Sequence, residues 1–419
     1  MIRIGLGRTT HPAAWSAFAA MLAMAGLPIY IHAPKYYVDE YGVSLGALGA
    51  VLFALRLIDF AQDPLLGWLA HATAAHRKAM VAGGAAVLSL SMLGLFAVAP
   101  PIAPLAWFAL TLTGLFSAFS FLTICFYAQG VQKAEAMGAD GHVRLAAWRE
   151  AGALLGVCAA AAAPSLLALG PNPPFESFAI LFAAFALGAL WVMRDAFAAP
   201  ADAAPIALQG FVAVLGDRVS RRLLLVALLN AAPVAVSSTL FLFFVESRLQ
   251  APGWEGALLI LFFLSAALAA PLWAAAARVH GERPILIAAM ALSVAAFALA
   301  ALLGPGDTLH FAAICVVTGA ALGADLTLLS ALFARRMVRV LPDAATGFAL
   351  WAFMSKATLA LAAISVLPFL EWQGFTGPDS PPGALLALGL VYALVPCTLK
   401  LLAIAVLAAT PIEREPSHA

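Results

Sequence analysis

The chain has 419 residues, of which 64% are hydrophobic and only 10% are charged, so it lacks the polar residues that a soluble fold of this length needs at its surface. This composition excludes a soluble enzyme, a disordered protein and a nucleic-acid-binding protein with a basic patch. The 22 Lys and Arg residues nearly balance the 21 Asp and Glu residues, and the net charge of +1 provides no electrostatic attraction toward DNA.

Twelve apolar stretches follow one another along the chain, each long enough to cross about 30 Å of hydrocarbon as a helix. We expect them near residues 13–33, 43–70, 79–100, 103–131, 145–168, 175–195, 223–245, 255–279, 284–304, 309–334, 346–370 and 384–409. Runs of this length are too long for the strands of a membrane barrel, so helices are predicted. The first stretch is also too long for the core of a signal peptide, which predicts an uncleaved span.

The positive charges predict how these spans are oriented. With the N-terminus in the cytoplasm, 16 of the 22 Lys and Arg residues fall on the cytoplasmic side, two fall outside and four lie within spans. The cytoplasmic residues are Arg3, Arg8, Arg77, Lys78, Lys133, Arg144, Arg194, Arg218, Arg221, Arg222, Arg278, Arg283, Arg335, Arg336, Arg339 and Arg414. The outside pair is Lys35 and Arg248, and the residues within spans are Arg56, Arg149, Lys356 and Lys400. This distribution predicts that both termini lie in the cytoplasm.

The longest connection between spans lies near the middle of the chain and begins with the Ala- and Pro-rich run AAPADAAP. It divides the sequence into an N-terminal six-helix bundle at 1–195, a central cytoplasmic loop at 196–222 and a C-terminal six-helix bundle at 223–419. This layout resembles the major facilitator fold. The predicted fold class is therefore an all-α membrane protein with twelve transmembrane helices in two six-helix bundles.

The second span carries the densest group of membrane charges. Arg56, Asp59 and Asp63 are spaced at i, i+3 and i+7, which places them on one face of a helix, and Gln62 lies three residues after Asp59. Two carboxylates one turn apart repel each other unless a cation lies between them or one is protonated. A bound Na⁺ or an exchangeable H⁺ would satisfy this requirement. The alternative is a structural salt bridge in which Arg56 neutralises one aspartate.

The segment containing these charges resembles the glycoside–pentoside–hexuronide:cation symporters, and among them the melibiose permeases. The similarity rests on an aromatic stretch, a turn and the pattern R-x-x-D-x-x-x-D-P-x-x-G. The matching residues are Tyr36, Tyr37, Asp39, Gly42, Arg56, Asp59, Asp63, Pro64 and Gly67. The resemblance implies a transporter in which a cation gradient drives the movement of a solute.

The same resemblance implies roles for individual residues. The implied cation-binding residues, each with an oxygen ligand, are Asp59, Gln62, Asp63 and Ser120, with the two aspartates holding Na⁺ if the protein is sodium-coupled. In WREAGALLG the resemblance places Arg149 on a sugar-contacting arginine, and in GFALWAFMSK it places Lys356 on a lysine near the acidic cluster. Two sugar-contacting aspartates of the melibiose permeases are replaced here by Ala23 and Thr123, which argues against a galactoside.

Several other polar residues within spans are candidates for contacts with substrate. The full substrate-binding set that we predict is Arg56, Thr123, Tyr127, Arg149, Asp325 and Lys356. Asp325 is expected either to pair with Lys356 or to meet the substrate. Lys400 is expected to be a counter-ion inside the C-terminal bundle rather than a substrate contact. Glu150 is expected either to form an interhelical structural pair or to take part in ion coupling.

These observations predict a secondary active transporter that couples Na⁺ or H⁺ to symport of a small polar solute, with a sugar or glycoside as the first candidate. The alternatives are a lysophospholipid or amphiphile carrier or flippase of the same fold, and a non-transporting membrane sensor or assembly protein. Walker, nucleophile-elbow and HExxH motifs are missing from the sequence, so we expect neither an enzyme nor a cofactor other than the coupling ion. The expected partners are the solute and the lipid bilayer, and no nucleic acid is expected. We expect the protein to be a monomer and to lie in a bacterial-type inner membrane.

Overall fold

A computed structural model describes residues 12–136, 141–198, 208–340 and 345–411, and all regular structure in these residues is helical. Within them, twelve helical stretches are long and apolar enough to cross a membrane. The predicted all-α fold class with twelve spans is therefore confirmed. The chain divides into two compact units, residues 1–204 with 255–260 and residues 205–254 with 261–419, which we call the N-terminal and C-terminal units.

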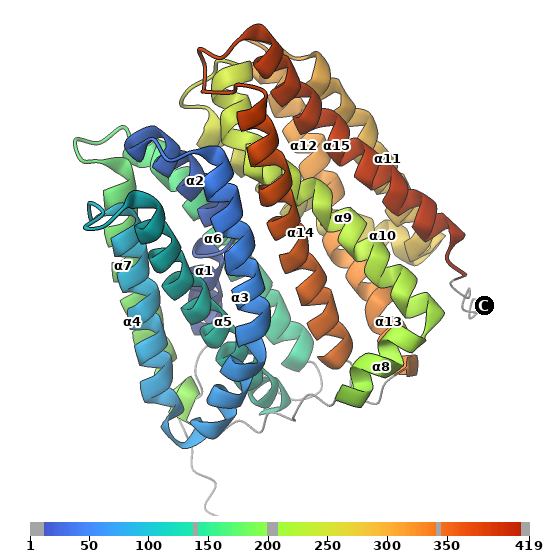
Figure 1. The fold of residues 1–419 in the computed structure, drawn as a ribbon. Coiled ribbons are helices and arrows are strands. Elements are labelled where there is room, and N and C mark those ends of the chain that lie inside the picture. Colours follow the sequence, from blue (N-terminus) through green and yellow to red (C-terminus); the bar gives the residue numbers. More distant parts are fainter. Residues whose placement is uncertain (1–11, 137–140, 199–207, 341–344, 412–419) are drawn as a thin grey trace, which may run out of the picture. The chain divides into compact units, whose positions relative to one another are not determined.

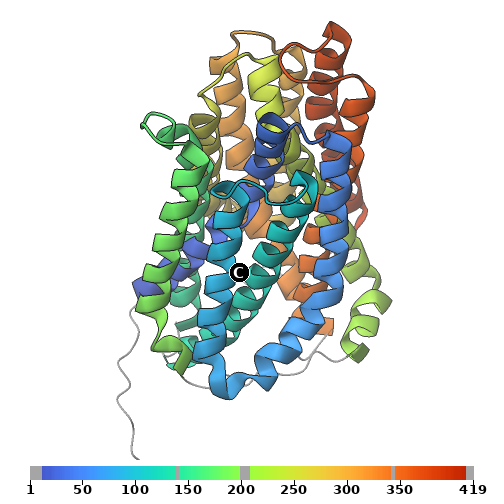
Figure 2. The ribbon, with the colours of Figure 1, turned by 60° about the vertical axis from the view of Figure 1, so that its left-hand side comes forward.

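The N-terminal unit is built from long helices that pack along their sides. In the described residues these are α1 (Pro12–Met24), α2 (Leu27–Tyr41), α3 (Leu45–Ala72), α4 (Arg77–Phe96), α5 (Pro104–Ala136), α6 (Gly141–Leu167) and α7 (Pro174–Met193), with short turns η1 (Ala74–His76) and η2 (Ala196–Ala198). Helix α1 packs against α6, and α3 packs against α5. Helix α4 contacts both α5 and α7 (Figures 1 and 2).

The first span is longer than predicted and is interrupted. It runs from Pro12 to Tyr41, whereas the sequence suggested an end near residue 33. Gly26 leaves the helical region with φ −93° and ψ −122°, and a proline in the first turn of α2 restarts the helix. The hydropathy of the sequence shows no boundary here because both halves are apolar. As a result α2 carries Tyr30 and the tyrosines Tyr36 and Tyr37 within a helix.

Two glycines in α6 set its close contact with α1. A Cβ atom on Gly152 would lie 2.1 Å from the carbonyl oxygen of Ser16, and one on Gly156 would lie 2.3 Å from that of Ala20. Such distances leave no room for a side chain, so the two backbones touch, as small residues four apart permit in membrane helices. This contact fixes the position of Arg149, which lies one turn before Gly152 on the same helix.

The C-terminal unit packs around its first long helix. Its described elements are α8 (Leu208–Gly216), α9 (Arg218–Phe243), η3 (Phe244–Arg248), α10 (Glu255–His280), α11 (Glu282–Ala298), η4 (Leu299–Leu302), α12 (Thr308–Ala324), η5 (Asp325–Leu329), α13 (Ser330–Val340), α14 (Ala345–Trp372) and α15 (Pro382–Ala409). The first residues of α10, 255–260, belong to the N-terminal unit. Helix α9 packs against α14 and α15, and α11 against α12 and α15 (Figure 1). The buried core includes Leu224, Met290, Phe333 and Leu407.

The segment expected as a central loop at 196–222 is partly helical. Helix α8 lies within it, and α9 already begins at Arg218. Asp217 caps α9 because its carboxylate accepts hydrogen bonds from the backbone N–H and the hydroxyl of Ser220, at 2.8 and 2.6 Å. Arg336 of α13 donates two further hydrogen bonds to the same carboxylate, from Nε at 2.9 Å and from Nη2 at 2.5 Å. The Arg336 guanidinium holds the pKa of Asp217 well below its usual range.

Candidate functional site

Arg56, Asp59 and Gln62 form a connected set of polar side chains on α3. Arg56 and Asp59 make an ion pair, and the amide of Gln62 donates a hydrogen bond of 2.8 Å to the other oxygen of Asp59. Asp59 is only 2% exposed and Arg56 only 8%. The predicted spacing on one helical face is confirmed, and the structure contains the salt bridge that the sequence left as an alternative. Both side chains of the ion pair are buried, so they are shielded from bulk water.

Two aromatic rings complete the surroundings of Arg56. Its guanidinium carbon lies 4.4 Å from the ring centre of Tyr30 on α2 and 4.5 Å from that of Phe116 on α5. Such contacts stabilise a desolvated cation by up to about 2 kcal/mol each. The sequence did not predict either ring, because contacts between separate helices leave no local pattern.

The residue of α5 that reaches this set is Ser117. Its hydroxyl donates a hydrogen bond of 2.8 Å to Oε1 of Gln62. The predicted ligand Ser120 lies one turn further along α5 and is buried, and Thr123 follows one turn later with a buried hydroxyl that has no hydrogen-bond partner among the described residues. Ser117, which the resemblance did not indicate, therefore joins the candidate site through Gln62.

Asp63 lies one turn beyond Asp59 on α3 and is less buried. Arg56 attracts both carboxylates electrostatically, so its charge offsets the repulsion expected between two acids one turn apart. The residue types on α3 and at Ser117 are two carboxylates, an amide oxygen and a serine hydroxyl, which are the oxygen ligands that a hard cation prefers. Among the described residues, no group of three or more His, Cys, Asp or Glu side chains could hold a metal ion.

Arg149 of α6 lies beside Tyr127 of α5 in the N-terminal unit. The guanidinium carbon is 4.4 Å from the centre of the tyrosine ring. Tyr127 is 48% exposed and the neighbouring Trp148 is 40% exposed, in contrast to the buried set around Arg56. The predicted substrate residues Arg149 and Tyr127 are thus brought together, and they present a flat cationic and aromatic surface.

The structure pairs Asp325 with Lys400 rather than with Lys356. The Lys400 ammonium of α15 donates to Oδ2 of Asp325, and the two residues are 5% and 4% exposed. Asn230 of α9 also interacts with this carboxylate. The sequence missed this pairing because three helices far apart in the chain supply the three groups. The expectation that Lys400 is a counter-ion inside the C-terminal unit is confirmed.

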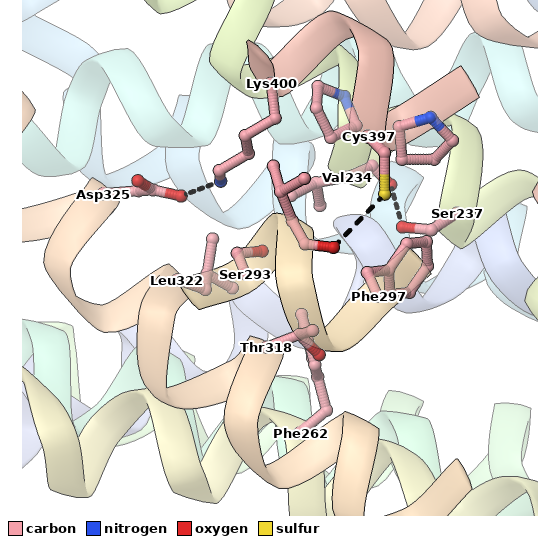
Figure 3. Close-up of a pocket in the computed structure, with 13 residues that line it drawn as sticks. Val234, Ser237, Phe262, Ser293, Phe297, Thr318, Leu322, Asp325, Cys397 and Lys400 are labelled. Carbon is pink, nitrogen blue, oxygen red and sulfur yellow. Dashed lines mark hydrogen bonds and ion pairs between the residues drawn. The ribbon is translucent and has the colours of Figure 1, made fainter. Parts of the chain in front are cut away.

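A cavity of about 40 Å³ lies next to this ion pair (Figure 3). Its lining combines apolar residues with three hydroxyl side chains and a thiol, which are Ser237, Ser293, Thr318 and Cys397. A space of this size accommodates water but not a sugar ring. The C-terminal unit therefore contains a small, mostly apolar cavity with hydroxyl groups, a carboxylate and an ammonium in its wall.

Lys356 lies half-buried on α14 of the C-terminal unit, whereas Asp59 and Asp63 lie on α3 of the N-terminal unit. Its pairing with the acids of the second span stays a prediction. The candidate residues therefore fall into three groups, around Arg56 on α3, around Arg149 on α6 and around Asp325 beside α12.

The family described as MFS/sugar transport protein matches residues 13–414 of the chain. Among solved structures, the chain is similar to a crystal structure of the nucleoside transporter NupG, with a TM-score of 0.71 and 15% identity over 94% of this chain and 98% of that one. It is also similar to the crystal structure of a mutant of NupG, with a TM-score of 0.68 and 15% identity over 94% of this chain and 100% of that one. Likeness at this identity shows the fold. No curated protein matches the chain in sequence.

Proposed function

The chain belongs to the MFS/sugar transport protein family, and from this membership we propose that it couples Na⁺ or H⁺ to symport of a small polar solute, with a sugar or glycoside as the first candidate. The resemblance seen in the second span is confirmed at the level of the family, which is one of transporters and not of enzymes. We place the protein as a monomer in a bacterial-type inner membrane with both termini in the cytoplasm, and we assign the six-helix bundles to residues 1–195 and 223–419.

The observation that carries this proposal is the polar set on α3. Asp59 is held by Arg56 and Gln62, and Asp63 follows one turn later. Buried charges within a span are costly and mark functional sites by default. A cation would find carboxylate oxygens on Asp59 and Asp63 and an amide oxygen on Gln62, with Ser120 as the hydroxyl ligand.

The proposed coupling follows from competition for the carboxylates. In the structure the guanidinium of Arg56 supplies the positive charge next to Asp59. A bound Na⁺, or a proton on one carboxylate, replaces that charge and frees Arg56 to hydrogen-bond the solute. Solute binding must then raise the affinity for the cation by the same factor. The two bundles would expose the site alternately to the two sides of the membrane.

The solute side of the proposal uses the remaining predicted residues. Arg149 and Tyr127 offer a face on which a sugar ring stacks and to which its hydroxyls bond. Thr123 contributes a buried hydroxyl with no hydrogen-bond partner among the described residues, and Asp325 and Lys356 contribute from the C-terminal unit. Replacement of the family's acids by Ala23 and Thr123 favours a solute other than a galactoside.

The proposal is tested by uptake into proteoliposomes that contain the purified full chain. A panel of radiolabelled monosaccharides, glucosides, glucuronides and galactosides is offered with an inward Na⁺ gradient, an inward H⁺ gradient or neither. We expect at least one solute to accumulate only when a gradient is imposed. If no solute accumulates and a labelled lysophospholipid crosses the bilayer instead, the protein is an amphiphile carrier and the proposal fails.

The proposed orientation is tested with single cysteines at exposed positions. Arg218→Cys lies in the predicted cytoplasmic region and Asp379→Cys lies in a predicted outer turn, and both sites are exposed. A membrane-impermeant maleimide added to intact cells should label position 379 and leave position 218 unlabelled. Labelling of both positions in intact cells would contradict the twelve-span topology.

A further inference from the structure

Three helices of the C-terminal unit carry a π-turn or an internal proline at one cavity. Helix α12 passes into the π-turn η5 at Asp325, while Pro233 interrupts the hydrogen bonding of α9 and Pro396 that of α15. Both prolines line the same cavity as Asp325. Prolines leave helix carbonyls without an N–H partner, and π-turns occur frequently at functional sites. Helices that only pack against one another need neither a π-turn nor prolines at the place where they meet.

We propose that Asp325, Lys400 and the cavity beside them form a proton-binding site inside the C-terminal unit, in which the carboxylate of Asp325 takes up the proton. The site belongs to a different unit from the acids of α3. The inference rests on the proposed symport for its physiological use, because it identifies a second place where a coupling ion binds. Binding of the proton itself needs no solute.

The geometry of the ion pair leaves one carboxylate oxygen open to a proton. Oδ2 of Asp325 accepts from the Lys400 ammonium, while Oδ1 is buried and has no hydrogen-bond partner among the described residues. Figure 3 shows the two side chains meeting at the edge of the cavity. A proton on Oδ1 neutralises the carboxylate without a clash with Lys400.

The cavity has room and hydrogen-bonding groups for water that can hand a proton to Asp325. The hydroxyl of Thr318 donates to the carbonyl of Ile314 at 2.7 Å, and that of Ser237 donates to the carbonyl of Val234 at 3.3 Å. Because these hydroxyls donate to their own helices, their oxygens remain as acceptors for water or for an ammonium. A cavity of about 40 Å³ exceeds the volume of roughly 10–15 Å³ that one water needs.

Protonation of Asp325 changes the charge of the site by one unit. A hydronium ion in the cavity gives its proton to Oδ1 of Asp325, an O–H bond forms, and a water molecule is left. Lys400 keeps its three protons but loses its carboxylate partner, so the site changes from neutral to a net charge of +1. The ammonium then needs further acceptor oxygens, and water and the hydroxyl side chains that line the cavity supply them. Proton uptake therefore leaves a net positive charge inside the C-terminal unit.

The charged groups of α11 and α12 lie in the first turns of these helices, and those of α13 lie in its second half. Facing Asp325 are Lys400 and the Cys397 thiol from α15 and the uncharged Asn230 from α9. The remaining titratable residues on the elements that contact η5 are Glu282 and Arg283 of α11, His310 and Cys315 of α12, and Arg335, Arg336 and Arg339 of α13. Glu282 and Arg335 pair with each other, and Arg336 pairs with Asp217. Lys400 is thus the charge that controls Asp325.

The test measures the proton directly, by infrared difference spectroscopy of the purified full chain in lipid. As the pH is lowered, the C=O band of a protonated carboxyl group should appear in the wild type and should lose one component in Asp325→Asn. In Lys400→Met the same component should already be present at neutral pH, because an unpaired buried carboxylate neutralises itself by taking up a proton. The matched control is Asp217→Asn, which removes an ion-paired carboxylate near the helix ends and should leave this component unchanged.

A transport measurement separates this inference from the proposed function. The double variant Asp325→Asn with Lys400→Met contains no lone charge, so it should fold, and it should fail to accumulate solute in a proton gradient. The inference is overturned if Asp325→Asn shows the full wild-type band, or if the double variant accumulates solute like the wild type, since the pair is then structural. If neither the wild type nor any variant moves solute, the proposed symport is refuted. The infrared spectra still decide whether Asp325 binds a proton.

Discussion

Loss of either side chain of the Arg56–Asp59 ion pair should strongly lower the free energy of unfolding. Removing one partner of a buried pair costs about 3–5 kcal/mol, because it leaves an uncompensated charge. Arg56→Met also removes two aromatic contacts worth roughly 0.5–2 kcal/mol each and leaves Asp63 without its nearby positive charge. We therefore expect Arg56→Met to destabilise the protein by about 5 kcal/mol and Asp59→Asn by about 3 kcal/mol.

The double variant decides whether this reasoning is correct. Arg56→Met with Asp59→Asn leaves no lone charge at this pair, so its cost should be smaller than the sum of the two single variants by about 2–3 kcal/mol. The assay is denaturant unfolding of the purified protein in detergent micelles, followed by tryptophan fluorescence. Free energies of unfolding that add within about 0.5 kcal/mol would show that the two side chains do not act as a pair.

Two further predictions concern packing and pH. Gly156→Ala should lower the free energy of unfolding by about 1–3 kcal/mol, because its Cβ would lie 2.3 Å from the carbonyl oxygen of Ala20. The measurement is thermal unfolding, and the control Gly83→Ala should be neutral because its Cβ would meet no atom within 4 Å. Equal effects of the two substitutions would refute the close contact. Arg336 lowers the pKa of Asp217, so the wild type should have a higher free energy of unfolding than Asp217→Asn. This difference should have its full value above the ordinary carboxyl pKa of about 3.9 and should decline as the pH falls below it. A stability difference that instead grows on acidification would contradict that sign.

The spans could be predicted from the sequence because membrane insertion leaves a strong local signal. Apolar length and the side on which Lys and Arg fall both act on each span separately. The same signals do not predict the break at Gly26, because both halves of the first span are apolar. They also do not predict α8, which lies within a connection between spans. Its residues, LQGFVAVLG, are apolar but too few to span a membrane.

The candidate site was only partly predictable for a different reason. The i, i+3 and i+7 spacing placed Arg56, Asp59 and Asp63 on one face because it depends on a single helix. Ser117 and the partner of Asp325 depend on how separate helices pack, and no spacing within one helix records that. A buried charge did carry a usable signal, since Lys400 required a counter-ion in its own unit, but the sequence offered Lys356 as another partner for Asp325.

The central claim is that the acids of α3 bind the cation that drives solute uptake, and Asp63→Asn tests it most directly. The measurement is accumulation in proteoliposomes of whichever labelled sugar or glycoside the wild type transports, with and without an imposed Na⁺ or H⁺ gradient. Asp39→Asn is the matched control, because Asp39 is an exposed carboxylate paired with Lys35 at the end of α2. The account predicts that Asp63→Asn loses gradient-driven accumulation while Asp39→Asn retains it. Gradient-driven accumulation by Asp63→Asn at the wild-type level would contradict the account.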